Sequence, residues 1–457
     1  MSRDPVIAGT PSADELLRLA ERLVGYAEVQ GATQAEALVQ GGDRYLTRFA
    51  NSQIHQNVGE TDVSVQVRFV MGKRIGVSGT NRLDDESLRR SVATAAEIAR
   101  VQPELPDFTS LPEPGPIAEV EGRYAHATAE ASPEERAEGA RAVIGAADAA
   151  GVQAFGSFAT RLERTAVANS LGVRAAEQRT LSQLITVCMG PDGEAGYAEA
   201  ASVDHTGIDP GALGREAADK AGRSRGAMLL EPGDYPVVLE EYAVVDLLDM
   251  LGYLGFSALA VQEDRSFFEP GKRVGSDLVS IWDDATDPSG TPTAFDAEGV
   301  GKQRVQLVEG GVCREVVYDA YTAGKAGRGS TGHGLPAPNP WGPFPLNQFM
   351  APGDTGREEL IGGLKRGLLV TRFHYTNPVH PKLAMVTGMT RDGLFLVEDG
   401  RVSGPVRNLR FTQSYLAALA GVEAVSRERK LLRGFLGSVL VPSVRISAFT
   451  FTGATEH

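Results

Sequence analysis

Cysteine is nearly absent from this chain of 457 residues, which contains only Cys188 and Cys313. The two cysteines stand far apart and form no CxxC pair, so the sequence argues against a disulfide framework and against a thiolate zinc site. Cys188 lies in an apolar run, residues 184–188, and we expect it to be a small buried hydrophobic residue.

Positive charge is also in deficit. Lys and Arg together number 45 and Asp and Glu 59, which gives a formal net charge of -14. A nucleic-acid-binding surface needs clustered cations. The densest basic patch, residues 427–433, contains two leucines and is interpreted as the solvated face of a helix. We therefore expect no nucleic-acid partner.

Long apolar runs are missing as well. No stretch approaches the roughly 18 consecutive apolar residues of a membrane-spanning helix, so no membrane partner is expected. Residues 1–10 include Asp4 and Pro5 and have no apolar core, which argues against a signal peptide. These features predict a cytoplasmic protein.

The composition that remains, 42% hydrophobic and 23% charged, is typical of a globular protein, and the length favours two domains. A turn cluster at residues 231–234 (EPGD) is the best boundary between them. We predict an α+β protein: an α/β domain with a mixed or antiparallel sheet over residues 1–230, and a strand-rich domain over residues 231–457.

Capping residues and hydrophobic periodicity define the elements of the first domain. Ser12 with Glu15 forms a capping box, and Ser132 precedes Pro133 at a first helical position. Helices are expected over residues 12–29, 84–101, 133–150 and 210–225, and strands over 35–40, 45–50, 61–70, 73–79, 165–168, 182–189 and 197–203.

The first domain has the pattern of an internal duplication. Residues 50–52 and 168–170 both read Ala-Asn-Ser, and each is followed by an alternating strand and then by a helix rich in Ala and Glu. Chance similarity between two α+β segments explains the pattern equally well, so both interpretations stay open.

The second domain is predicted to be rich in strands and turns. It opens with a strand and a strongly apolar helix, and it contains two hairpins, one of them turning at Asp399-Gly400. A Gly/Pro/Asn-rich stretch over residues 324–356 has no periodicity, and such long loops are usually functional or disordered. Strands are expected over 235–239, 304–308, 312–318, 394–397, 401–406, 438–441 and 444–451, and helices over 241–256 and 414–420.

A narrow polar stripe marks the apolar helix at residues 241–256. Asp246, Asp249 and Tyr253 are spaced by three, four and seven residues and therefore share one face. Two carboxylates and a phenol fit the wall of a cleft, and without a nearby histidine they form a hard-ion site at best. The alternative is a stripe that meets water or a backbone amide.

The seven histidines form no HxH, HExxH or helical pair. His374 and His380 flank Asn377-Pro378 and are expected on a turn. His333 lies in a glycine-rich run, residues 329–334, that lacks the lysine of a phosphate-binding loop. On spacing alone, the sequence contains no complete catalytic constellation.

Along nearly its whole length, however, the chain resembles the TldD/PmbA family. The motifs that carry the resemblance are residues 61–70 (TDVSVQVRFV), 72–76 (GKRIG), 79–84 (GTNRLD), 167–172 (VANSLG), 295–299 (FDAEG), 386–393 (VTGMTRDG) and 397–401 (VEDGR). Each motif is modest alone, and their number and order make the match fairly specific. The resemblance implies an amino-terminal α/β domain and a barrel-like carboxy-terminal domain.

Active, TldD-like members of the family carry a His-Glu-x-x-x-His helix after the first strand of the second domain, and a late Cys completes their zinc site. At the matching positions this sequence has Asp249 for the first His, Met250 for the Glu and, within one residue, Tyr253 for the second His. The segment that would hold the Cys, residues 434–437 (GFLG), has none. Losing all four groups is typical of the PmbA-like (TldE-like) branch.

The resemblance therefore implies a non-catalytic subunit without a cofactor of its own. It would bind a TldD-like catalytic partner, which holds the zinc, and help to guide unfolded or extended peptides into a shared chamber. We predict peptide or interface contacts at His333, His374, Tyr375 and Asn377. The sequence does not determine which peptides are processed. It also does not determine whether the chain forms a homodimer without its partner.

Two alternatives remain. One is an independent hydrolase whose metal site combines Asp246 or Asp249 with His374 and His380. The other is a modulator that acts through protein contacts and has no peptidase role.

Overall fold

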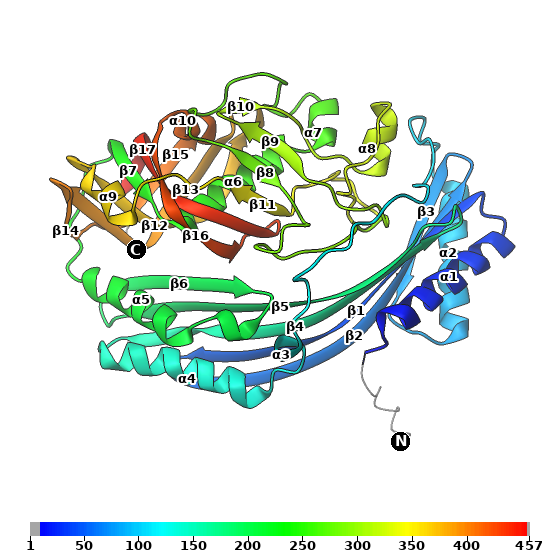
Figure 1. The fold of residues 1–457 in the computed structure, drawn as a ribbon, viewed down its shortest axis with the longest axis horizontal. Helices are drawn as coiled ribbons and strands as arrows, with labels where there is room; N and C mark the ends of the chain where they lie inside the picture. Colours follow the sequence, from blue (N-terminus) through cyan, green and yellow to red (C-terminus); the bar gives the residue numbers. More distant parts are fainter. Residues whose placement is uncertain (1–9, 455–457) are drawn as a thin grey trace.

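A computed structural model describes residues 10–454 and combines helices with sheets, which confirms the predicted α+β class. The strands form a six-stranded sheet and an 11-stranded sheet (Figure 1). Of residues 1–10, for which we predicted no signal peptide, residues 1–9 lie outside the described part of the chain. None of the helices between residues 10 and 454 combines the length and the apolar character that a membrane crossing requires.

The first sheet is antiparallel throughout, in the order β3-β2-β1-β4-β5-β6. Its strands are β1 (Gln34–Ala50), β2 (Gln53–Met71), β3 (Arg74–Thr80), β4 (Gln153–Asn169), β5 (Arg174–Met189) and β6 (Ala195–Ser202). The two short strands predicted over residues 35–50 are one strand. Gly41, Gly42 and Asp43 interrupt the hydrophobic pattern, but they pair with β2 on one side and with β4 on the other.

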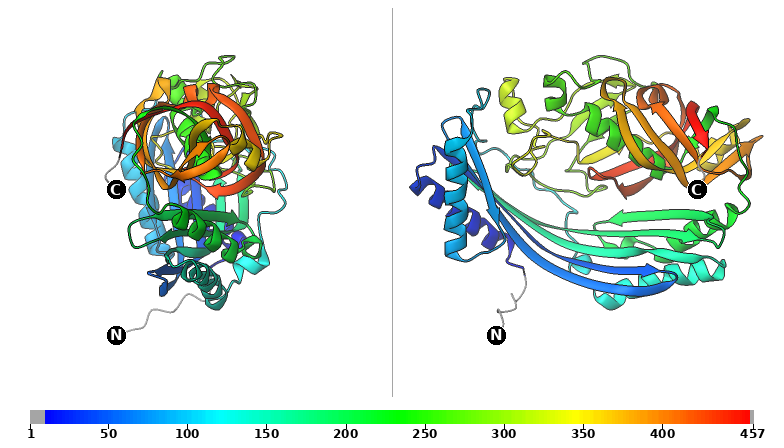
Figure 2. Two further views of the ribbon diagram at one scale, coloured as in Figure 1. Left: turned by 90° about the vertical axis from the view of Figure 1, so that its left-hand side faces the viewer. Right: turned by 180° about the vertical axis from the view of Figure 1, so that it is seen from behind.

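Four helices cover the convex face of this curved sheet, away from the second sheet (Figures 1 and 2). Helix α1 begins at the predicted capping box of Ser12 and Glu15, and α4 begins after Ser132. All four predicted helices are confirmed: α1 (Ala13–Val29), α2 (Asp85–Val101), α4 (Pro133–Ala149) and α5 (Pro210–Arg223); the short α3 (His126–Ala129) and η1 (His205–Gly207) complete the region.

Strand periodicity assigns the two faces of the sheet. Ala37 and Val39 of β1 pack beneath α1 and α2, whereas Leu38, between them, packs against Phe295 of the second half of the chain. Cys188 is fully buried beneath α4 and α5, as predicted.

The same order of elements occurs twice in the first sheet, as α1-β1-β2-β3-α2 and as α4-β4-β5-β6-α5. The two units meet at their first strands, since β1 pairs with β4 at the centre of the sheet. Asn51 directly follows β1 and Asn169 is the last residue of β4, so the two Ala-Asn-Ser segments lie at nearly equivalent places, where each strand ends.

The second sheet mixes parallel and antiparallel pairs. Strand β17 pairs with both β15 and β7, and the pairings run from β7 through β12, β13, β15 and β17 back to β7. The strands are β7 (Gly233–Leu239), β8 (Ile281–Asp283), β9 (Val305–Glu309), β10 (Val312–Cys313), β11 (Asn347–Met350), β12 (Arg366–His380), β13 (Met385–Glu398), β14 (Arg401–Pro405), β15 (Leu409–Ser414), β16 (Val422–Arg433) and β17 (Ser438–Ala454).

Helix α6 (Glu241–Gly255) follows β7 and packs against β12, β16 and β17. Apart from Asp246 and Tyr253, every one of its residues is buried, which confirms the apolar helix with a narrow polar stripe. The remaining helices are α7 (Ala258–Gln262), α8 (Ala320–Lys325), α9 (Arg357–Gly362), η2 (Pro381–Leu383) and α10 (Tyr415–Ala420).

Several local predictions are wrong. The strand predicted over residues 312–318 ends at Cys313, and the strands predicted over 438–441 and 444–451 are one strand, β17. The basic patch at residues 427–433 lies in strand β16, because it pairs with β17 and buries Leu432. His374 and His380 lie on β12 and not on a turn; the chain turns later, at η2. Pro378 fits a strand here because register shifts interrupt the β12–β13 ladder on either side of it.

The second sheet sits within the concave curve of the first (Figure 2). Arg68 of β2 joins the two layers: it lies 3.3 Å from the Glu36 carboxylate of β1 and 3.1 Å from that of Glu298, which belongs to the predicted FDAEG motif. Gly299, in the same motif, has a φ of 76°, and a side chain there would overlap Val173, in the turn between β4 and β5.

Candidate functional site

Helix α6 meets the segment at residues 434–437, which is the place where the family motif and its late cysteine would come together. The backbone N–H of Phe435 donates a 2.7 Å hydrogen bond to Asp249 Oδ2. A side chain at position 434 would overlap the same carboxylate, so Gly434 leaves the room that Asp249 occupies. Met250 lines the same space, and the Tyr253 ring lies 6.0 Å from that of Phe435.

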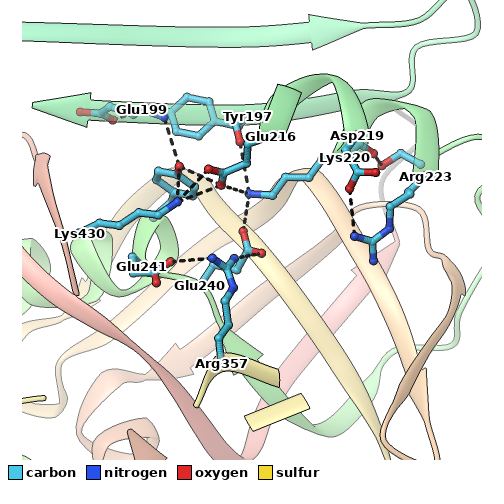
Figure 3. A network of polar contacts seen from close by, with 12 residues as sticks. Tyr197, Glu199, Glu216, Asp219, Lys220, Arg223, Glu240, Glu241, Arg357 and Lys430 are labelled. Carbon is cyan, nitrogen blue, oxygen red and sulfur yellow. Dashed lines mark hydrogen bonds and ion pairs between the residues drawn. The ribbon is translucent and has the colours of Figure 1, made fainter. Parts of the chain in front are cut away.

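A buried polar network fixes the start of α6 (Figure 3). Glu240, which caps the helix, accepts a 2.7 Å hydrogen bond from Lys220 of α5 and a 2.6 Å hydrogen bond from Arg357 of α9. Lys220 also bonds Glu216 at 2.8 Å, and Lys430 of β16 approaches both Glu216 oxygens at 3.0 Å. The network therefore ties α6 to the first sheet as well as to its own.

The two aspartates of α6 differ in their partners. Asp246 accepts hydrogen bonds from the hydroxyls of Thr376 (2.6 Å) and Tyr415 (2.7 Å). Burial raises the pKa of Asp246 to about 6, although the two hydrogen bonds lower it. Asp249 is 2% exposed, and its Oδ1 atom has no hydrogen-bond partner within the described residues. Burial, with a smaller contribution from the Asp246 charge, raises the pKa of Asp249 to about 8.

Both aspartates line a cavity of about 460 Å³ between α6, β6, β12 and β16. Its walls also carry two guanidinium groups. Arg372 is held by a 2.6 Å bond to Asp392 and lies 4.3 Å over the ring of Tyr197, and Arg433 donates to Ser438 at 3.1 Å. The cavity thus combines a protonatable carboxyl group with fixed cations and aromatic rings.

Exposed aromatic side chains surround the polar stripe. Tyr375 is 79% exposed, Phe435 59% and Trp341 55%, and the Tyr253 ring lies within 6.4 Å of both Phe435 and Trp341. We call Tyr375, Phe435 and Trp341 the aromatic rim.

The four predicted contact residues fall in different places. Tyr375 lines the cavity, with a backbone φ of 57°, and Asn377 is exposed two residues further along β12. His374 is half-buried. His333 has no exposed surface; its two ring nitrogens contact Asp283 at 2.8 Å and Thr331 at 2.9 Å. A side chain held in this way cannot touch a peptide, so its place in the prediction is wrong.

The donor set at this site does not fit the zinc of the family. Zinc is held by thiolate, imidazole and carboxylate groups, and the positions matched to the family motif offer one carboxylate, a thioether, a phenol and a glycine. Asp249 is moreover engaged by the Phe435 N–H. Among residues 10–454 no group of three or more His, Cys, Asp or Glu side chains could hold a metal ion, so the Asp246, Asp249, His374 and His380 of the alternative hydrolase do not form one.

Comparison with known proteins matches three family models to successive parts of the chain. They are PmbA/TldA metallopeptidase domain 1 (residues 35–99), the central domain (127–225) and the C-terminal domain (232–453). The fold and site thus define a protein built on a metallopeptidase-like architecture. The chain belongs to the PmbA/TldD family.

Individual relatives agree with this membership. A metalloprotease of Methanothermobacter thermautotrophicus is 28% identical over 232 residues, 49% of this chain and 50% of that protein. A zinc metalloprotease TldD homolog of Saccharolobus solfataricus is 26% identical over 214 residues, 44% of this chain and 46% of that protein. The chain thus matches about half the length of these curated relatives.

A solved structure matches the whole fold. TldE from Thermococcus kodakarensis superimposes with a TM-score of 0.85, covering 95% of this chain and 99% of that one. The sequence identity is 21%, so this similarity establishes the fold.

Several residues of the site were not predicted from sequence. Arg372 and Arg433 line the cavity, and Phe435 and Trp341 belong to its rim. None had a local signal, because each reaches the site from a segment distant from α6. The one available hint was the family's late cysteine, which pointed to residues 434–437.

Proposed function

We propose that this chain is a TldE-like subunit that performs no zinc chemistry itself and serves a TldD-like partner. One observation carries the proposal. The two segments that hold the zinc site in active members of the family meet in this fold, but they bring together Asp249, Met250, Tyr253 and Gly434. The scaffold of the site is kept and its metal ligands are not.

The partner's zinc would then cleave peptides that this chain helps to position. The aromatic rim supports that role, because exposed Tyr, Trp and Phe are enriched where proteins bind partners. The exposed end of β12, from Tyr375 to His380, offers backbone groups to an extended peptide, which can bind by adding a strand. The barrel-like second domain would form one wall of the shared chamber.

The decisive experiment expresses the chain alone, its TldD-like partner alone, and both together. Metal content and cleavage of unfolded peptides are measured for each preparation after a chelator wash. We expect zinc in the partner, and cleavage that disappears when the partner's metal ligands are replaced. Stoichiometric metal and cleavage by this chain alone would overturn the proposal.

The rim provides a second test. The double variant Tyr375→Ala/Phe435→Ala should weaken binding to the partner at least about tenfold, since central aromatic residues dominate interface energies. Tyr124→Ala is the matched control, because Tyr124 is 38% exposed and lies in the connection between α2 and α4. Binding that both variants leave unchanged would place the interface elsewhere. If this chain binds its partner but does not change the partner's cleavage of peptides, the modulator alternative is favoured.

A further inference from the structure

A second cavity, of about 200 Å³, lies between the concave face of the first sheet and the second half of the chain. It shares Arg433 with the cavity beside Asp249. At its other end it shares Gln40, Thr165 and Arg179 with a cavity of about 250 Å³ over the middle of β1 and β4. The three cavities therefore follow one another between the two layers. We call the middle one the Lys302 cavity.

Lys302 is the unusual residue of this cavity. Its side chain lines the wall and is 7% exposed. Between residues 10 and 454 the Lys302 ammonium group has neither a hydrogen bond nor an ion pair. Burying a cation without a partner is costly, and such groups are rare unless something pairs with them. An unpaired ammonium in a cavity wall therefore points to a ligand that carries negative charge.

The nearby carboxylates offset part of the Lys302 charge but make no direct hydrogen bond or ion pair with its ammonium group. Asp283, Asp296 and Glu177 act on Lys302 through their charge, but donors from surrounding segments hold them. Asp296 accepts hydrogen bonds of 2.6–2.9 Å from the N–H groups of Glu298, Val300 and Gly334. Asp283 is bonded by the Asn347 N–H at 2.7 Å and by the His333 ring at 2.8 Å. Glu177 accepts from the Ala294 N–H at 2.9 Å and from the Thr293 hydroxyl.

Two further cations line the Lys302 cavity. Arg179 is paired with Glu163 at 2.8 Å, and Arg433 is half-buried. Burial lowers the pKa of Arg433, and the like charge of Arg179 lowers it further. Burial likewise lowers the pKa of Lys302, with a contribution from Arg179. An anion bound among the three cations would relieve both effects.

The wall also holds apolar side chains, Phe295, Leu335 and Leu436 among them, beside uncharged polar residues and the carboxylates of Glu177 and Asp296. We propose that the Lys302 cavity binds a carboxylate next to an apolar side chain, namely the C-terminal residue of an extended peptide. Lys302 and Arg433 supply charge-assisted hydrogen bonds to the two carboxylate oxygens, and the apolar residues of the wall contact the side chain of the peptide. The peptide identity of the ligand rests on the proposed function; the preference for a carboxylate rests on the cavity.

The test uses the full chain and pairs of apolar peptides that differ only in a free or an amidated C-terminus. Calorimetric titration should give at least about tenfold tighter binding for the free acid. Lys302→Met should abolish that difference, Lys302→Arg should retain part of it, and Lys365→Met, at an exposed lysine outside the cavity, should keep it. Circular dichroism and Tm show whether each variant folds.

The outcomes separate this inference from the proposed function. Equal affinity of the wild-type chain for free acid and amide would overturn the carboxylate site while leaving a peptide-binding role intact. An amidated peptide that ends in glutamate and binds as tightly as the free acid would overturn the assignment to a peptide terminus. If no peptide binds to this chain, alone or in complex with its partner, the peptide-guiding function itself fails.

Discussion

At the scale of single residues, Asp249 has the most unusual chemistry of the site. It is the residue that we match to a metal ligand of the family, and it is buried, with Oδ1 unpartnered within the described residues and Oδ2 held by the Phe435 N–H. Its pKa, raised to about 8 by burial, lies above the ordinary value of 3.8 that it takes in the unfolded chain. Folding therefore takes up a proton over this interval, so the free energy of unfolding falls as pH rises from about 4 to 8.

Asp249→Asn removes the ionisation and keeps the shape of the side chain. We expect the variant to have a higher Tm than the wild type, with a difference that grows as pH is raised from 5 to 8. Thermal denaturation of both proteins across this range measures the effect. The exposed Asp148 on α4 gives a control, Asp148→Asn, whose offset should not grow in the same way. A constant offset for Asp249→Asn would contradict the assigned pKa.

Gly434 and Asp249 depend on each other, because a side chain at position 434 would overlap the Asp249 carboxylate. Gly434→Ala should destabilise the protein by roughly 1–3 kcal/mol, the usual cost of overpacking. In the Asp249→Ala background the same change should cost less, with a coupling energy of about 0.5–3 kcal/mol. Denaturant unfolding of the four proteins completes the cycle. Gly453→Ala, where an added Cβ meets nothing within 4 Å, is the control; additive effects would show that the two positions act independently.

At the scale of elements, helix α6 is held by charges as well as by its apolar surface. Lys220, on α5, is 5% exposed. Glu240, the N-cap residue of α6, is 3% exposed. Removing one partner from a buried pair leaves the other charge without compensation, which costs far more than losing a pair on the surface.

Lys220→Met should therefore lower the free energy of unfolding by about 3–5 kcal/mol. The expected cause is that the buried Glu240 carboxylate at the start of α6 loses one of its two cationic partners and keeps only Arg357. Lys272→Met breaks an exposed pair with Glu269 and should cost no more than about 1 kcal/mol. Equilibrium unfolding in urea compares the two variants with the wild type. Similar losses in both would mean that the Figure 3 network does not fix the helix.

At the scale of the whole molecule, Arg68 connects the curved sheet to the FDAEG motif of the second half. Burial raises the pKa of Glu36 to about 7, and it also raises that of Glu298, although Arg68 opposes both shifts. The Arg68 guanidinium thus favours the ionised form of two carboxyl groups whose burial favours the protonated form, at the contact between the layers.

Arg68→Met should destabilise the protein more at pH 8 than at pH 6. Without the guanidinium group, the pKa values of Glu36 and Glu298 would rise further, so the two carboxyl groups bind protons more completely at pH 6 than at pH 8 and escape more of the cost of a buried, unpaired charge. Tm measured at the two pH values tests this sign. A Tm loss that is the same at pH 6 and pH 8 would contradict the charge-based account.

Much of the fold was predictable because its signals are local. The capping boxes at Ser12 and Ser132 start α1 and α4, and Asp399-Gly400, both with positive φ, turns the β13–β14 hairpin. The pairing of β1 through Gly41 and Gly42 was not predictable, because it depends on two neighbouring strands. For the same reason the basic patch of β16 was assigned to a helix, and His333 was taken for a contact residue.

The sequence by itself determined the family, because motif identity is a property of the residues alone, and it is the basis on which we match Asp249, Met250, Tyr253 and residues 434–437 to the family's zinc-site positions. It also determined the polar stripe of α6, which follows from helical spacing. Only the tertiary structure decided that Phe435 donates to Asp249, that aromatic rings surround the site, and that Lys302 lies unpaired beside Arg179 and Arg433. These features depend on contacts between segments far apart in the chain, and a cavity forms only where such segments meet.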